Sequence, residues 1–428
     1  MNLRAQLAQT RFGLGSRPDH ASPGDPERWL ALQLAGADVT PPVTTVPEAF
    51  QALTLDRTEP RPPGETNRAR ALFRQDALAL VDQAITTAAP FRERLVWFWA
   101  NHFTVSLRRG EVAPLIGSYV RDAIRPHVTG RFGDMLLAVM RHPAMLLYLD
   151  NAGSAGPASA GGQRQRRGLN ENLARECLEL HTCSPAAGYT QADVTEFARI
   201  LTGWSVERTA EPVGFKFRPF VHDPGPKRVL GRNFPEGEAG GTEALAFLAA
   251  HPMTHRHLAT KLVRHFVNDV APPDAVYTIQ SVLRDTGGDL GAASAALIHL
   301  PAAWQPLTKL RTPWEFVIAA IRAAGLPPDN RPDVMGIVAG LGQPVFDAPF
   351  PIGWPDTAAD WAGPEAMVRR VDWAFGFSGR AQVPDAAALA ETALGPLASP
   401  ATMAELSRAG SRRDAITLLL ASPEFQRR

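Results

Sequence analysis

Apolar residues recur at helical spacing through most of this chain, whereas alternating runs of β-branched residues are nearly absent. Ala, Leu and Arg, which favour helices, fill the segments that carry this spacing. The segments predicted to be helical are 68–89, 91–107, 112–126, 131–141, 170–182, 191–203, 252–268, 275–285, 289–299, 313–325 and 412–422. The best strand candidate is 213–223, where Phe215, Phe217 and Phe220 lie between polar residues. The sequence therefore predicts a mainly α fold with at most a small β-hairpin.

Three long stretches without helical spacing interrupt the predicted helices, namely 150–170, 208–241 and 342–364. The first is rich in Gly, Ala and Ser and has Arg-Gln-Arg-Arg near its end, which is typical of a mobile surface loop. Loops this long in a compact helical body usually have a function or bind a partner. We predict one helical domain over 1–428, with an amino-terminal helical lobe at 1–150, a flexible loop at 150–170 and a motif-rich remainder at 170–428.

The charges of the chain nearly balance, with 44 Lys and Arg against 43 Asp and Glu and a formal net charge of +1. A general nucleic-acid binder needs a long-range positive field, so no nucleic-acid partner is expected. No run of about 18 apolar residues predicts a membrane span. The amino terminus lacks the apolar run behind a basic start that marks a secretory signal. We therefore expect a cytoplasmic protein, and export together with a partner stays open.

The two cysteines, Cys177 and Cys183, lie on one predicted helix and its exit. A disulfide needs Cα atoms closer than about 7 Å, which this placement does not favour. No disulfide is predicted, and the sequence assigns neither cysteine a role.

The stretch 170–182 gathers more reactive side chains than any other part of the chain. On a helix, Glu171, Arg175 and Glu179 lie on one side, and His181 lies among the apolar residues of the other side. One interpretation is structural: a solvated face with an ion pair, and a histidine that is buried or caps the helix. The other interpretation is a reactive site built around this helix.

Two other segments supply partners for such a site. His102 lies on the buried face of the helix at 97–106, and a buried imidazole needs a partner because an unpaired buried polar group costs about 1 to 3 kcal/mol. The turn-rich loop at 222–231 adds His222 and Asp223, which also fit an ordinary turn at the surface. Together with 170–182, these segments favour the reactive site.

The helix predicted at 252–268 and the residue before it carry His251, His255, His257 and His265. The i, i+4 spacing of His251 and His255 occurs in metal sites, but no HExxH glutamate lies between them. The chain also lacks a GxGxxG after a strand, a Walker loop, a GxSxG elbow and a CxxC pair. Nucleotide-binding, zinc-protease and serine-hydrolase functions therefore lose most of their support.

Segments along the whole chain together resemble the bacterial family called domain of unknown function 1800. The segments that carry the resemblance are TRFGLGSRP, FWANHFTVS, LDNAGSAG, RGLNENLAREC with LELHT, GYTQADVTEFARILTGW, HDPGPKRVLG, ATKLVRHFV, TPWEFVIAAIRAAG, LGQPVFDAPFPIGWPD and LLASPEFQRR. The resemblance implies a mainly α fold. It also implies a partner from a second family, domain of unknown function 1501, whose fold resembles that of sulfatases.

The resemblance also implies which residues matter. The residues at the motif positions of the family are Asn101, His102, Asn170, Glu171, Arg175, Glu176, Glu179, His181, Gln191, Asp193, His222, Asp223, Lys227, Trp354 and Asp356. Cys177 stands where the family pattern usually has Leu, so neither cysteine counts as family chemistry. The FPIGWPD segment lacks the lysine of the family's form, which puts a lysine role in that loop in doubt.

The first functional hypothesis is an enzyme of hydrolase type, with a pocket between the helices at 97–106 and 170–182. Three carboxylates, two buried histidines and an arginine can form a general acid–base pair or a divalent metal site. The predicted catalytic residues are His102, Glu171, Arg175, Glu179, His181, His222 and Asp223. The predicted metal ligands are His102, Glu171, Glu179 and His181. In this hypothesis Arg175 orients an anionic group.

The second functional hypothesis is a scaffold or assembly partner of an exported, sulfatase-like protein. The same polar side chains then form a buried network that fixes the packing, and such networks perturb pKa values as active sites do. Solvent access distinguishes the two hypotheses, because catalytic residues need a cleft, whereas a structural network can be closed.

Overall fold

Helices carry most of the chain in the computed structural model, as the apolar spacing predicts. The structure describes residues 2–36, 39–59, 64–165, 168–380 and 382–428. The α-helices in these ranges are α1 (Leu3–Leu7), α2 (Pro26–Ala35), α3 (Val46–Thr58), α4 (Arg68–Thr86), α5 (Pro90–His102), α6 (Ile116–Tyr119), α7 (Phe132–Arg141), α8 (Pro143–Tyr148), α9 (Ala160–Gln165), α10 (Asn172–Glu176), α11 (Gln191–Leu201), α12 (Glu238–Ala249), α13 (Pro252–Phe266), α14 (Pro273–Asp285), α15 (Leu290–Ile298), α16 (Pro313–Ala324), α17 (Val334–Gly340), α18 (Ala358–Trp361), α19 (Pro364–Ser378), α20 (Ala386–Ala393), α21 (Pro400–Arg408), α22 (Arg412–Ala421) and α23 (Pro423–Gln426). None of the helices in these ranges is both long and apolar enough to cross a membrane. The prediction of a mainly α fold is confirmed.

Each predicted helix has a helical counterpart at the same place in the chain. The segment 112–126 is helical in short pieces of 3-10, α- and π-helix rather than as one helix. The stretch 170–182 forms α10, which continues as a π-helix at Cys177–His181. The structure also contains helices that the sequence did not predict, such as α12 and those of the carboxyl-terminal part between α17 and α21.

Capping residues set the starts of the helices that matter for the site. Thr190 and Asp193 form a capping box at the start of α11. Thr312 and Glu315 form the same motif at α16, where the backbone N–H of Thr312 donates to Glu315 at 2.9 Å. Every residue of α16 is buried. The capping box therefore holds the Glu315 carboxylate at the amino-terminal end of a helix inside the protein.

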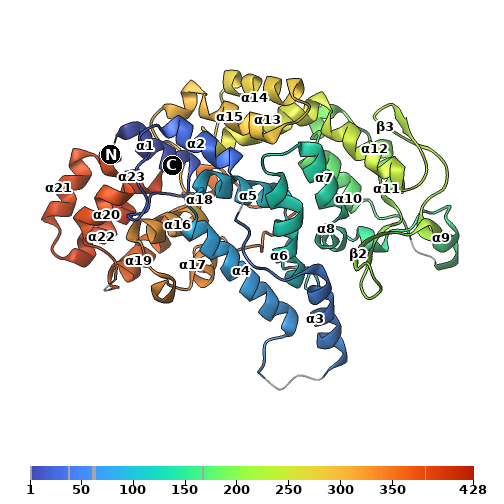
Figure 1. Ribbon diagram of the computed structural model, residues 1–428, viewed down its shortest axis with the longest axis horizontal. Coiled ribbons are helices and arrows are strands. Elements are labelled where there is room, and N and C mark those ends of the chain that lie inside the picture. Colours follow the sequence, from blue (N-terminus) through green and yellow to red (C-terminus); the bar gives the residue numbers. More distant parts are fainter. Residues whose placement is uncertain (1, 37–38, 60–63, 166–167, 381) are drawn as a thin grey trace.

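Four short strands form two antiparallel pairs toward one end of the molecule (Figure 1). The strands are β1 (Trp204–Glu207), β2 (Gly214–Phe217), β3 (Lys227–Val229) and β4 (Arg232–Phe234). Trp204 lies opposite Phe217 in the first pair, and Lys227 lies opposite Phe234 in the second. The predicted strand at 213–223 is therefore shorter than expected, and its partner is the segment that follows α11.

The predicted flexible loop at 150–170 contains regular structure. A 3-10 turn lies at Asn151–Gly153, and α9 covers Ala160–Gln165. Residues 166 and 167, the last two arginines of the Arg-Gln-Arg-Arg sequence, lie outside the described residues. The stretch 342–364 is irregular until α18, as predicted.

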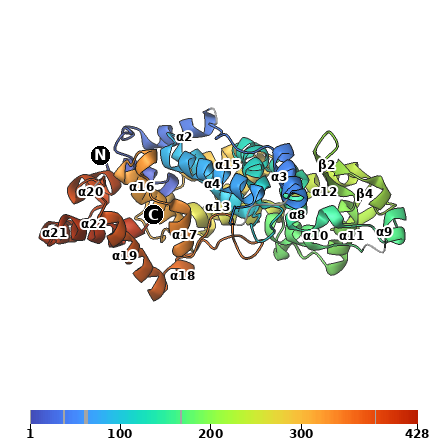
Figure 2. The same ribbon diagram turned by 90° about the horizontal axis from the view of Figure 1, so that it is seen from below.

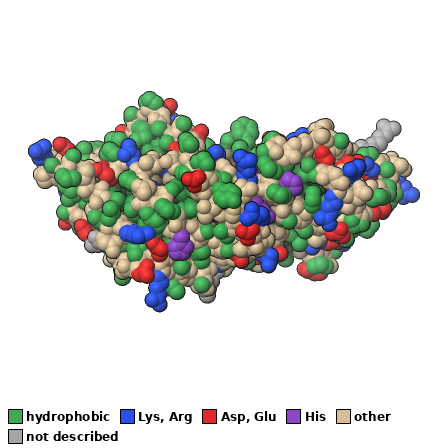
Figure 3. Space-filling model, turned by 90° about the horizontal axis from the view of Figure 1, so that it is seen from above, with side chains coloured by type: hydrophobic (Ala, Val, Ile, Leu, Met, Phe, Trp, Pro, Cys, Tyr) green, Lys and Arg blue, Asp and Glu red, His purple; other side chains and the backbone are tan. Residues whose placement is uncertain are grey.

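Two hydrophobic cores lie along an elongated body (Figures 1 and 2). The first core contains α5, α7, α11 and α13, and the second surrounds α16 with the helices of the red end, α19 to α22. Trp97 and Phe346 pack against both cores. On the face shown in Figure 3, acidic and basic side chains are interspersed, in keeping with a net charge of +1.

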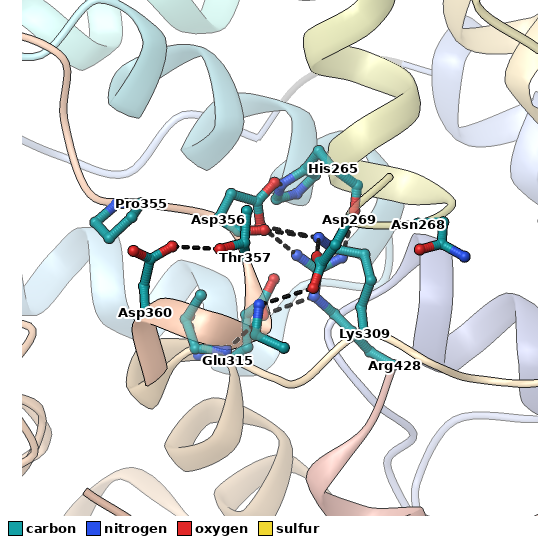
Figure 4. A network of polar contacts seen from close by, with 12 residues as sticks. His265, Asn268, Asp269, Lys309, Glu315, Pro355, Asp356, Thr357, Asp360 and Arg428 are labelled. Atoms are coloured by element: carbon teal, nitrogen blue, oxygen red, sulfur yellow. Dashed lines mark hydrogen bonds and ion pairs between the residues drawn. The ribbon is translucent and has the colours of Figure 1, made fainter. Parts of the chain in front are cut away.

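A buried network of charges joins the two cores (Figure 4). Glu315 accepts hydrogen bonds from Arg94 of α5 and from Nε of Arg428, the latter at 2.7 Å. Nη2 of Arg428 also donates to Oδ1 of Asp356 at 2.9 Å. Oδ2 of Asp356 accepts a hydrogen bond from Nδ1 of His265 on α13, also at 2.9 Å. Five segments that are far apart in the sequence therefore meet at these charges.

The carboxylates of this network stay ionised although they are enclosed. Burial raises the pKa of Glu315, but the charges of Arg428 and Arg94 outweigh burial and lower this pKa to about 2. Burial also raises the pKa of Asp356, but His265 and Arg428 prevail and lower it. The pairing of charges therefore offsets the cost of removing them from water.

Replacing Arg428 with Gln tests how much the network stabilises the fold. Arg428 is 1% exposed, and its loss removes one partner from the buried carboxylate of Glu315 and one from the half-buried carboxylate of Asp356. Breaking a buried ion pair costs about 3 to 5 kcal/mol. We therefore expect Arg428→Gln to lower the urea midpoint clearly, as measured by circular dichroism.

The control is Arg408→Gln, because Arg408 and its partner Glu405 are both exposed. A pair of this kind contributes less than about 1 kcal/mol. Equal urea midpoints for the two variants would contradict a structural role for Arg428.

Candidate functional site

A cavity of about 390 Å³ lies beside the charge network, where the two cores meet. This volume lies in the range of small-molecule sites, about 300 to 1,000 Å³. The aromatic residues of its apolar wall are Trp97, Phe98, Trp314, Phe346 and Trp354. The ring centroids of Trp97 and Trp314 are 4.1 Å apart, and Phe346 stacks on Trp97 at 5.5 Å. The cavity therefore offers flat aromatic surfaces to a ligand.

The loop before α18 is fixed against α5 and closes one side of the cavity. The Asn101 side chain donates to the backbone O of Trp354 at 2.9 Å, and Oδ1 of Asn101 accepts from the backbone N–H of Trp354 at 2.8 Å. Gly353 has a φ of +81°, and a Cβ there would lie 2.4 Å from the backbone O of Asn101. Only glycine allows the loop to come this close.

The polar wall of the cavity comes from α13. His257, Lys261 and His265 line the cavity at i, i+4 and i+8, so they lie along one face of the helix. Arg264 also lines the cavity and is exposed. The opposite face of α13 buries Leu258, Ala259, Leu262, Val263 and Phe266 in the first core. Core packing therefore orients the polar face toward the cavity.

His257 is a neutral histidine with one free ring nitrogen. Its Nε2 lies 3.0 Å from the backbone O of Leu180. A carbonyl oxygen only accepts, so Nε2 carries the proton and Nδ1 carries the lone pair. Burial, and next the charge of Lys261, lower the pKa of His257 to about 4. At neutral pH, His257 therefore presents an unprotonated nitrogen that no described residue occupies.

Lys261 lies one turn after His257 and is half-buried. Its ammonium group has no hydrogen bond or ion pair with any residue in the described part of the chain. Burial lowers the pKa of Lys261 to about 8, although the charge of Asp356 opposes this shift. Asp356 already binds His265 and Arg428, so it does not pair with Lys261. The cavity therefore holds an uncommitted amine that remains mostly protonated at neutral pH.

His265 is fixed rather than free. Its Nδ1 donates to Asp356, and its Nε2 accepts a hydrogen bond from Nε of Arg94 at 3.2 Å. Burial is the main cause that lowers the pKa of His265 to about 4. A second proton would have to displace the arginine N–H. His265 therefore supports the wall of the cavity and keeps no lone pair for a ligand.

His102 and His181 lie close together beside the cavity. Their ring centroids lie 6.0 Å apart, and Nε2 of His102 donates to the backbone O of His181 at 3.2 Å. Burial lowers the pKa of His181 to about 3 and that of His102 well below its usual value, so both are neutral. His102 lines the cavity, whereas His181 is fully enclosed. Together with His257, His102 satisfies the last carbonyls of the helix at 170–182.

Glu171, Arg175 and Glu179 do not line the cavity. The carboxylate of Glu171 accepts hydrogen bonds from Thr195 at 2.6 Å, from Gln191 at 2.8 Å and from Arg175 at 2.8 Å. The hydrogen bonds from Thr195 and Gln191 lower the pKa of Glu171. These contacts tie α10 to α11 at the surface. The structural interpretation of this helix face therefore fits Glu171 and Arg175.

The predicted metal ligands are not assembled into one group. Among the described residues, no cluster of three or more His, Cys, Asp or Glu side chains has an arrangement that could hold a metal ion. Of the set His102, Glu171, Glu179 and His181, the two histidines are buried together and Glu171 belongs to the surface network. Both cysteines are free and buried.

His222 and Asp223 lie in a separate cluster that binds the 222–231 loop to α11. The guanidinium of Arg199 donates to Oδ1 of Asp223 at 2.7 and 2.9 Å. Nδ1 of His222 donates to the backbone O of Thr202 at 2.7 Å, and its Nε2 accepts from the backbone N–H of Gly237 at 2.9 Å. Both nitrogens of His222 are thus occupied, and neither residue lines the cavity.

The sequence did not identify His257, Lys261 and Arg264 as site residues. It weighed the same helix through His251 and His255, but Nδ1 of His251 accepts from the backbone N–H of Met253 and so caps the helix. The signal that was available is the polar face that begins at His257. This polar face becomes part of a cavity only because α5 and the 342–364 loop pack against it. No local sequence pattern shows that packing.

The comparison with protein families agrees with these observations. Six of the segments that carry the family resemblance contribute residues to the lining of the cavity, namely TRFGLGSRP, FWANHFTVS, LELHT, ATKLVRHFV, TPWEFVIAAIRAAG and LGQPVFDAPFPIGWPD. The family model described as protein of unknown function (DUF1800) matches residues 7–427. Comparisons with curated proteins and with solved structures gave no match. The match covers nearly the whole chain, and the chain belongs to the DUF1800 family.

Proposed function

We propose that this protein is an enzyme of hydrolase type that uses general acid–base catalysis in the cavity between α5, α13 and α16. The observation that carries the proposal is the free Nδ1 of His257, which lies one helical turn from the uncommitted ammonium of Lys261. Hydrolysis of a polarised bond uses a base to take a proton from water and a cation to stabilise the negative charge that develops on the substrate.

His257 is the proposed general base. Its donation to the backbone O of Leu180 fixes the tautomer, so the lone pair stays on Nδ1. Its pKa of about 4, lowered by burial, keeps it unprotonated at neutral pH. In the proposed reaction, Nδ1 takes a proton from a water molecule as that water attacks the substrate. The proton then passes to the leaving group.

Lys261 is the proposed electrostatic partner. Negative charge develops on an oxygen of the substrate when water attacks, and a cation already in place stabilises that charge. Because no described carboxylate pairs with Lys261, its charge is available to the reaction. The aromatic wall beside it reduces the access of water and so strengthens the interaction.

The scaffold hypothesis accounts for a different part of the same region. The network of Arg94, Glu315, Arg428 and Asp356 is paired throughout and links the two cores, as a structural network does. His257 and Lys261 are only half-buried and line the cavity. Solvent access therefore favours catalysis for this pair. A partner from the domain of unknown function 1501 family stays a prediction.

The variant His257→Gln tests the proposed base. A panel of chromogenic carboxylic and phosphoric esters should reveal a hydrolysed substrate, and His257→Gln should lower kcat/KM for it by about 100-fold or more. His299→Gln is the matched control, because His299 is a surface histidine that contacts Glu27 outside the cavity. Full activity in a folded His257→Gln variant would rule out His257 as the base.

The dependence of kcat/KM on pH tests the pair. Activity should rise with pH through about 4, as His257 loses its proton, and fall through about 8, as Lys261 loses its own. Lys261→Arg keeps a positive charge at higher pH, so the descending limb should move upward. A descending limb that is the same in wild type and in Lys261→Arg would contradict the role of Lys261.

A further inference from the structure

Among the described residues that line the cavity, two cations and one carboxylate have no ion-pair partner, so positive charge is in excess. Lys261 and Arg264 lie three residues apart on α13, and neither forms a hydrogen bond or ion pair with another residue in the described ranges. Of the carboxylates that line the cavity, Asp356 and Glu315 are paired within the charge network. Asp360 accepts a hydrogen bond from the hydroxyl of Thr357 and keeps its negative charge. A ligand that enters the cavity therefore meets two cations that have no partner.

The order of the side chains along α13 separates their roles. His257 lies at the start of this row, against the backbone of Leu180, while Arg264, two turns later, is exposed. Lys261 lies between them on the same helix. A group held by Arg264 would thus place the neighbouring part of the ligand beside Lys261 and His257. A guanidinium suits an anionic group with two oxygens, because it donates two parallel hydrogen bonds.

The rest of the cavity is apolar. Trp97 forms a continuous aromatic surface with Trp314 and Phe346. Ile352 and Trp354 add to the lining from the loop before α18. Such a surface favours a flat apolar body over a strongly hydrated one. The cavity of about 390 Å³ limits this body to a small molecule.

We propose that the substrate is a small apolar or aromatic compound that bears an anionic oxygen group, with Arg264 as the residue that binds this group. This inference rests on the proposed function, because only an enzyme has a substrate. It adds the chemical class of the molecule that the cavity binds. Lys261 shares the negative charge, and the aromatic wall of Trp97, Trp314 and Phe346 holds the body.

Binding of benzoate is the test, with benzamide as the neutral compound of the same shape. Titration calorimetry at neutral pH should show that benzoate binds and that benzamide binds at least about tenfold more weakly, the effect of one charge-assisted contact. Acetate should also bind more weakly than benzoate, because it lacks the ring. Phenyl phosphate in place of benzoate shows which anionic group the site prefers, and tighter binding of either compound than of benzamide supports the inference.

Three variants separate specific from general effects. Arg264→Gln should weaken benzoate binding about tenfold. Arg256→Gln should leave it unchanged, because Arg256 is exposed on the same helix and does not line the cavity. Equal binding of benzoate and benzamide, or equal effects of the two arginine variants, would overturn the inference. His257→Gln should retain benzoate binding, since His257 is neutral.

The outcomes for the two proposals are distinct. Hydrolysis that depends on His257, without selective binding of benzoate or phenyl phosphate, would overturn this inference and leave the proposed function standing. Selective binding that depends on Arg264, without any hydrolysis that depends on His257, would support this inference on the ligand and overturn the proposed reaction.

Discussion

The pairing of Arg428 with Glu315 and Asp356 is the interaction on which the rest of the site depends. Two carboxylates enclosed between hydrophobic cores are tolerated only when cations compensate them. Arg428 meets this need for both, and Arg94 and His265 complete the shell. The same contacts fix α5, α13, α16 and the loop before α18 relative to one another. The cavity exists because these four elements are held together at its rim.

This pairing also explains why Lys261 is free. Asp356 is the carboxylate whose charge acts most on Lys261, but both of its oxygens are already bound by His265 and Arg428. Its attraction reaches Lys261 without forming a contact and offsets only part of the burial cost, so the pKa stays near 8. The paired network and the unpaired amine of Lys261 thus both follow from the way these charges are placed.

The sequence predicted the features that depend on the local spacing of residues, namely the helices and their buried faces. The helices followed from apolar periodicity and residue composition, and His102 and His181 were both placed on buried helix faces, which the structure brings together. The same reasoning gave too much weight to Glu171, which is reactive in type but faces solvent with partners on α11. The charge network could not be predicted, since Arg94 and Glu315 are 221 residues apart and pair only through the tertiary fold.

The histidines show what distinguishes structure from reactivity in this molecule. His222 and His265 each have a donor on one ring nitrogen and an acceptor on the other, so neither can take a proton without losing a contact. His102 donates through Nε2, but its Nδ1 is enclosed. His257 makes the same kind of donation to a helix carbonyl and keeps its second nitrogen at the cavity. Of these four histidines, His257 is the one whose second nitrogen is both without a partner and at the cavity, which is why we propose it as the base.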